Sequence, residues 1–170
     1  MKIRKYLSIA ILFMLMALSG VFTSCGDDNI VADDEQTESG LKVWVEPYHL
    51  KGARTDEVKN YMAKSMVRYH LLSETVTVNN TQLTYGTGKA GEGIVYSFSN
   101  LDGALYSVID TELAANSQVV IAYLKQHYIQ VFSVDDANME YCFTTVDKHL
   151  VITVMKVSKF HFNVSYSFVN

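Results

Sequence analysis

The sequence predicts an α+β fold in which one plan, a helix followed by an antiparallel β-meander, occurs twice. Apolar residues recur at four-residue spacing at Val58 and Met62, and again at Val120 and Leu124. This spacing is typical of an amphipathic helix. After each of these stretches the apolar residues alternate with polar ones, which indicates half-buried strands. We therefore expect the two helices to pack against the apolar face of an antiparallel sheet.

Local signals place the two helices. Gly52 leads into the first helix, and Thr55 is its expected N-cap. Asp56 and Glu57 follow, where acidic side chains favour the positive end of the helix dipole. Asn116 or Ser117 is expected to cap the second helix.

The expected strands follow from alternation and from the turn residues between them. The stretch from Leu41 to Glu46 alternates and ends at Pro47, which predicts a short edge strand. The other strands are expected around Val76 and Val78, Leu83 and Tyr85, Ile94 and Phe98, and Leu105 and Ile109, and then at 129–134, 139–145, 150–157 and 160–169. In the last stretch Phe160, Phe162, Val164, Tyr166 and Phe168 are expected to share one face.

The two halves align as an internal repeat. Val58 and Met62 superpose on Val120 and Leu124 with an offset of about 62 positions. We therefore expect one domain, 41–170, made of pseudo-repeats at about 41–112 and 113–170. Each half is a helix followed by an antiparallel meander, and neither half could cover its sheet alone.

The N-terminus predicts a secretory signal over 1–24 and lipid attachment at Cys25. Lys2, Arg4 and Lys5 precede an apolar run over 7–21, followed by small or hydroxyl residues. The alternative is a transmembrane helix, but the run is shorter than the roughly 20 residues that cross a bilayer. Cys25 is then the first residue of a mature bacterial lipoprotein, held in the membrane by its acyl chains.

A lipidated acidic tether is expected over 25–40. It carries six Asp and Glu residues and no Lys or Arg, and such a like-charge run with little apolar content stays solvated. Without signal and tether the chain is close to neutral, so no nucleic-acid partner is expected. Cys142 is then the one remaining cysteine, and no intramolecular disulfide is expected.

Three stretches carry a resemblance to known lipoproteins. Phe22-Thr23-Ser24-Cys25 resembles the looser lipoboxes of Bacteroidetes lipoproteins, and the acidic run after it resembles their surface-export signal. Gly52-Ala53-Arg54-Thr55, with Val58 and Met62, resembles the opening of many small Bacteroidetes lipoproteins. More distantly it is similar to SmpA/OmlA-type lipoproteins and to β-lactamase-inhibitor-protein-like domains. The resemblance implies an α+β fold, an outer-membrane or cell-surface location and a protein-binding role.

No cofactor, metal site or catalytic centre is expected. Gly86-Thr87-Gly88-Lys89-Ala90-Gly91 fits the dinucleotide fingerprint in letters, but a strand follows it where the fingerprint requires a helix. The five histidines, which are His49, His70, His127, His149 and His161, show no metal-ligand spacing. Cys142 is expected to be semi-exposed on a sheet face, and no local signature marks it as a nucleophile.

The aromatic residues suggest a contact surface. Trp44, Tyr48, Tyr85 and Tyr106 are not all explained by an apolar stripe, so they are the candidate contact residues. The alternative is that these rings fill the core of a small sheet. We expect a non-catalytic, lipid-anchored module that binds or scaffolds a protein, through the sheet face that the helices leave uncovered. A glycan-binding accessory protein is the alternative, and a small hydrolase built on Cys142 is a third.

Overall fold

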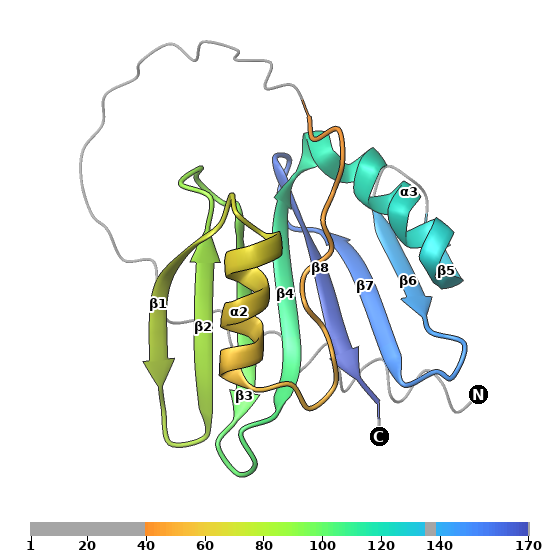
Figure 1. The fold of residues 1–170 in the computed structure, drawn as a ribbon. Helices are drawn as coiled ribbons and strands as arrows, with labels where there is room; N and C mark the ends of the chain where they lie inside the picture. The colour runs from red at the N-terminus through yellow and green to blue at the C-terminus, as the bar shows by residue number, and fades with distance from the viewer. Residues whose placement is uncertain (1–39, 135–138, 170) are drawn as a thin grey trace. The chain divides into compact units, whose positions relative to one another are not determined.

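An antiparallel sheet of eight strands forms the centre of the fold (Figure 1). The computed structural model describes residues 40–134 and 139–169, which belong to the unit Thr37–Asn170. In chain order the elements are α2 (Thr55–Ser65), β1 (His70–Val76), β2 (Asn80–Gly86), β3 (Gly93–Ser99), β4 (Leu105–Leu113), the 3-10 turn η1 (Ala114–Asn116), α3 (Ser117–His127), β5 (Ile129–Val134), β6 (Glu140–Thr144), β7 (Leu150–Lys156) and β8 (His161–Phe168).

The strands lie in the order β1-β2-β3-β4-β8-β7-β6-β5. The central pair is β4 and β8, which are antiparallel and pair from Ser107 opposite Ser167 to Leu113 opposite His161. This ladder joins strands that are far apart in the chain. The sheet is therefore continuous from β1 to β5.

The predicted α+β fold of two helix-plus-meander repeats is wrong. Two helices of 11 residues each accompany eight strands, so the sheet dominates the architecture. The physical reason is the ladder between β4 and β8, because it merges all the strands into one sheet with one core. The pseudo-repeats at 41–112 and 113–170 are therefore not separate structural units.

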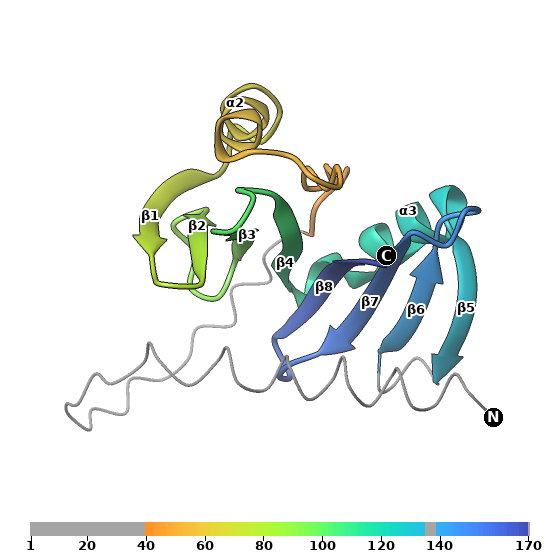
Figure 2. The ribbon, with the colours of Figure 1, turned by 90° about the horizontal axis from the view of Figure 1, so that it is seen from below.

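Both helices lie on the same face of the sheet (Figure 2). Alternating residues of β8, which are Phe162, Val164 and Tyr166, are buried, as the sequence predicts for this strand. Phe160 was expected to join them, but it lies before the strand and is exposed. The helices complete the core with four fully buried side chains at the predicted positions Val58, Met62, Val120 and Leu124.

The predicted strand at 41–46 is absent from the structure. The segment 40–54, named here the crossing segment, runs without strand pairing in front of β4 and β8 (Figure 1). Asn116 holds its start, because the side-chain Oδ1 accepts from the Leu41 backbone N–H at 2.9 Å. At its other end the Ala53 carbonyl accepts from the Leu105 backbone N–H at 2.8 Å. The segment is therefore held by separate hydrogen bonds at its two ends, and it does not pair with a strand.

The helix starts differ slightly from the predicted caps. Thr55 is the first residue of α2, and the N-cap is Arg54, whose backbone N–H donates to the Glu57 carboxylate at 2.8 Å. In α3 the N-cap is Asn116, one of the two predicted residues. Its side chain makes no capping bond, because it bonds the crossing segment and Glu112 instead.

Some expectations lie outside the described residues. These are the signal over 1–24, the lipid-attachment residue Cys25 and the part of the tether before residue 40. Among the residues described, no helix is long and apolar enough to cross a membrane.

Leu124→Ala tests how much of the stability comes from the contact between α3 and the sheet. We expect the free energy of unfolding to fall by about 2–5 kcal/mol, because a fully buried leucine leaves a cavity. Val131→Ala, on the exposed edge strand β5, is the control and should change stability by less than about 0.5 kcal/mol. Urea unfolding of both variants measures the difference, and equal losses would mean that α3 is only loosely packed.

Candidate functional site

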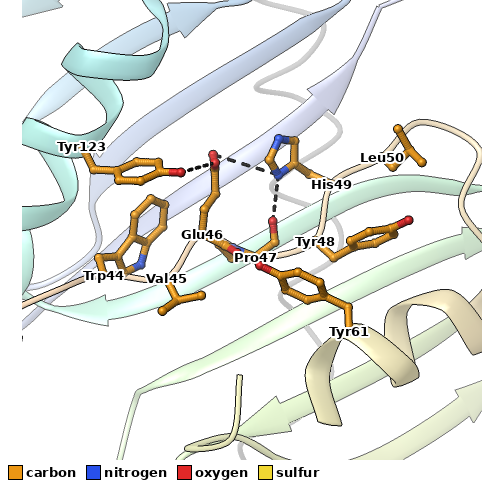
Figure 3. A pocket seen from close by; sticks show the side chains of 9 residues that line it. All are labelled: Trp44, Val45, Glu46, Pro47, Tyr48, His49, Leu50, Tyr61 and Tyr123. Carbon is orange, nitrogen blue, oxygen red and sulfur yellow. Dashed lines mark hydrogen bonds and ion pairs between the residues drawn. The ribbon is translucent and has the colours of Figure 1, made fainter. Parts of the chain in front are cut away.

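One hollow of about 480 Å³ opens between the crossing segment, α2 and α3. We call it the aromatic cup, and Figure 3 shows the side chains that line it. It is lined by Trp44, Val45, Glu46, Pro47, Tyr48, His49, Leu50, Tyr61 and Tyr123. Its volume falls in the range of small-molecule and side-chain binding pockets, about 300–1,000 Å³.

Two hydrogen bonds fix the crossing segment as the wall of the cup. Trp44 is 2% exposed, and its indole N–H donates to Asp110 Oδ2 in the centre of β4 at 3.2 Å. Tyr61 of α2 donates its hydroxyl to the backbone carbonyl of Glu46 at 2.8 Å. Pro47, the next residue in the chain after Glu46, is buried and has no N–H to satisfy. The wall is thus held by side chains that come from the sheet and from a helix.

Glu46 stands at the centre of a group of tyrosine hydroxyls. Its Oε1 accepts from Tyr128 at 2.8 Å and from Tyr166 at 3.1 Å, and its Oε2 accepts from Tyr123 at 3.1 Å. The glutamate side chain is 11% exposed. Three hydroxyl donors replace the water that this carboxylate loses, because a buried charge is tolerated only when it is hydrogen-bonded.

His49 lies beside this group. Its Nδ1 is 2.7 Å from the Pro47 carbonyl and 4.0 Å from Glu46 Oε1, and its Nε2 is 3.1 Å from the Tyr128 hydroxyl. The imidazole stacks on Tyr166 with ring centres 4.8 Å apart. Because the carbonyl only accepts, Nδ1 carries a proton in this arrangement.

The aromatic rings of the cup form two pairs. Trp44 and Tyr123 meet edge to face, with centroids 5.2 Å apart and planes at 79°. Tyr48 and Tyr61 are also 5.2 Å apart, with planes tilted by 38°. The rings therefore do not form a flat platform.

Burial and the negative Glu46 together raise the pKa values of the tyrosines around it. Loss of solvent raises the pKa of Tyr123 to about 12, and the nearby Glu46 charge adds to this shift. The same two causes, in the same order, raise the pKa values of Tyr61, Tyr128 and Tyr166. These hydroxyls consequently keep their protons and act as donors.

A second group of charges lies beneath the crossing segment. Glu112 of β4 accepts from Arg68 at 2.5 Å, from Tyr69 at 3.1 Å and from Asn116 at 2.7 Å. Arg68 also lies 3.7 Å from Glu92. A cavity of only about 40 Å³ adjoins this group, so it offers room for water and not for a larger ligand.

Asp110 is the least satisfied member of this group. It is fully buried, and its Oδ2 accepts from Trp44, whereas its Oδ1 has no hydrogen-bond partner. Burial raises the pKa of Asp110 well above its ordinary value, and the neighbouring Glu112 raises it further. The structure therefore holds this carboxyl in its neutral form at higher pH than usual.

Cys142 lies elsewhere, on β6, and it is buried, whereas the sequence suggested semi-exposure. Burial raises the pKa of its thiol, which opposes formation of the reactive thiolate. The glycine loop at 86–93 joins β2 to β3 with no helix after it. Among the described residues no group of three or more His, Cys, Asp or Glu is placed to hold a metal ion.

The four predicted contact residues lie in three places. Trp44 and Tyr48 both line the cup. Tyr85 is buried in the core with its ring edge-on to Tyr96. Tyr106 is exposed on β4, where its hydroxyl accepts from the Asn80 side chain at 3.2 Å. The four residues thus form no common surface, and their role in contact stays a prediction.

Sequence reasoning missed the residues that complete the cup. Glu46, Tyr61 and Tyr123 belong to the crossing segment, α2 and α3, and only the packing of these elements brings them together. One signal was available, because Tyr61 and Tyr123 both lie beside the apolar stripes of their helices, where a partly buried ring is expected.

Comparison of the chain with protein-family models, with curated proteins and with solved structures gave no match. The assignment of a function therefore depends on the geometry described above.

Glu46→Gln tests the electrostatic link between the glutamate and the tyrosines. Removing the negative charge should lower the pKa of Tyr123 below about 12, while burial keeps it above the ordinary value of about 10. NMR titration of ring-labelled tyrosine measures the change. The exposed substitution Asp147→Asn should leave the pKa of Tyr123 unchanged, and an equal shift in both variants would contradict the link.

Asp110→Asn tests the buried carboxyl. The folded protein keeps the Asp110 proton at pH values where the unfolded chain has lost it, so the unfolded state binds fewer protons and stability falls as pH rises. The loss begins near pH 4, around the ordinary aspartate pKa, and continues up to the raised pKa. Asparagine does not titrate, so the variant should show a smaller loss of stability as the pH rises from about 4.

Urea unfolding across this pH range measures both proteins. Parallel profiles for the two proteins would show that Asp110 is ionised in the folded state, and would rule out the proposed burial of a neutral carboxyl.

Proposed function

We propose that this protein is a lipid-anchored, non-catalytic binding module of the outer membrane or cell surface, and that it binds a protein partner through the aromatic cup. The observation that supports this most directly is the cup itself. It is a preformed hollow of about 480 Å³ with aromatic walls and one carboxylate held by three hydroxyl bonds. Aromatic side chains and a few fixed polar groups are what interface pockets use to hold partner side chains.

The location is supported by the N-terminal pattern. A positive n-region, an apolar run and Cys25 followed by an acidic tether are typical of an exported lipoprotein. A domain anchored by acyl chains needs no membrane-binding surface of its own.

The cup is a better candidate for the contact than the uncovered sheet face suggested by the sequence. On that face the central strands present mainly small polar side chains, such as Ser107, Thr111, Asn163 and Ser167. Interface hot spots are instead enriched in Trp, Tyr and Arg and sit in pockets. The cup provides one tryptophan and three tyrosines in one hollow.

Glycan binding is the second candidate, because sugars also stack on aromatic rings in open hollows. The ring planes disfavour it, since the pairs stand at 79° and 38° and offer no coplanar platform. Binding of neutral oligosaccharides by the mature protein, lost on filling the cup, would favour this candidate over a protein partner.

Two arginine substitutions in the crossing segment test the proposal. Val45→Arg fills the cup, whereas Val43→Arg changes a neighbouring side chain that is even more exposed and does not line it. Affinity capture of the tagged mature lipoprotein from crosslinked native membranes should recover a partner with the wild type and with Val43→Arg. Recovery should fall at least about tenfold with Val45→Arg, which corresponds to about 1.4 kcal/mol of binding free energy.

Equal recovery with the two arginine variants would remove the cup as the contact site. Failure to recover any reproducible partner with the wild-type protein would count against protein binding altogether.

A further inference from the structure

Glu46 has one hydrogen-bonding position that the described residues leave open. An ionised carboxylate offers about four lone-pair positions, two on each oxygen. Oε1 uses both of its positions, for Tyr128 and Tyr166, and Oε2 uses one, for Tyr123. A single acceptor position therefore remains on Oε2, in a side chain that lines the cup.

The charge of Glu46 is also incompletely paired within the described part of the chain. Its one ion-pair partner there is His49, at the limiting distance of 4.0 Å. The hydroxyls that bond it are neutral, and the raised pKa values of Tyr123, Tyr128 and Tyr166 keep them so. The residues lining the cup include no Lys or Arg. The cup thus presents one carboxylate, with no Lys or Arg beside it, between aromatic walls.

We propose that the cup binds the ammonium group of a lysine side chain of the partner protein, with one N–H donating to Glu46 Oε2. This inference rests on the proposed function. A hydrogen bond to a charged group is stronger than one between neutral groups, and a cation near aromatic rings gains further attraction from their faces. The apolar stem of a lysine side chain packs well along aromatic and aliphatic walls while its charge sits at the tip.

The single free acceptor position on Glu46 favours lysine over arginine. A guanidinium binds a carboxylate best through two parallel N–H bonds, one to each oxygen. Oε1 of Glu46 is fully occupied by two tyrosines, so only a single bond is available. An ammonium group, a compact charge with three independent donors, needs one bond to the carboxylate and can direct the other donors to tyrosine oxygens or water.

The chain contains its own reporter for the experiment. Trp44 is the single tryptophan of the whole sequence, and it lines the cup. Its fluorescence in the full-length mature protein in detergent therefore reports what enters the cup. The probes are blocked glycine–lysine–glycine and its counterparts with acetyl-lysine or arginine in the centre, together with butylamine and glucose.

We expect the lysine peptide to bind at least about tenfold more tightly than the acetyl-lysine peptide, which differs by loss of the charge. The arginine peptide should bind more weakly than the lysine peptide, and glucose should cause no change. Butylamine, which carries the ammonium group without a peptide, should bind more weakly than the lysine peptide. Glu46→Gln should bring the lysine and acetyl-lysine peptides to the same affinity, with circular dichroism confirming that the variant is folded.

Several results would overturn the inference. These are equal binding of the lysine and acetyl-lysine peptides, tighter binding of arginine or glucose, butylamine as tight as the lysine peptide, or no fluorescence change at concentrations up to about 50 mM. The comparisons on the wild-type protein decide this even if Glu46→Gln fails to fold. If Val45→Arg loses the captured partner while the peptides show no preference for lysine, the proposed function stands and this inference fails.

Discussion

The pairing of β4 with β8 is the constraint on which the rest of the structure depends. It places Asp110 and Glu112 of β4 opposite Val164 and Phe162 of β8, and all four side chains are buried. Two carboxyl groups are thereby held in the apolar centre of the sheet. Because buried polar groups are costly without partners, neighbouring elements must supply hydrogen bonds to this position.

The crossing segment and Asn116 supply hydrogen-bond donors to these two carboxyl groups. Trp44 covers β4 and donates its indole N–H to Asp110, and Asn116 bonds both Glu112 and the backbone of Leu41. The segment is consequently fixed across the middle of the sheet without becoming a strand. The crossing segment, which has no regular secondary structure, thus adds packing over the middle of a sheet whose described residues form no disulfide.

The cup is a consequence of this anchoring. Once Trp44 is held against β4, the next residues pass between α2 and α3, and Glu46 meets hydroxyls from α3, from β8 and from Tyr128 just after α3. A charge supported by tyrosines from several elements is a preorganised binding feature, because the binding of a ligand does not have to reorder it. Cys142 on β6 differs from Glu46, because it is buried and its raised thiol pKa opposes formation of the reactive thiolate.

The sequence alone determined the positions of most elements. The four-residue spacing of Val58 and Met62 and of Val120 and Leu124 located both helices, and strict alternation located β8. It failed at 41–46, where alternation suggested a strand. An alternating pattern indicates which side chains are buried, but it does not show that the backbone forms a strand. Trp44 is buried although its backbone lies in a loop.

Tertiary structure decided the fold class and the cup. The ladder between β4 and β8 is a pairing of segments far apart in the chain, so no local period could indicate that the two meanders form one sheet instead of separate repeats. Glu46 looked like an ordinary polar residue in the sequence. Its role depends on three hydroxyls that lie more than 70 positions away in the chain, and only packing brings them within hydrogen-bond distance.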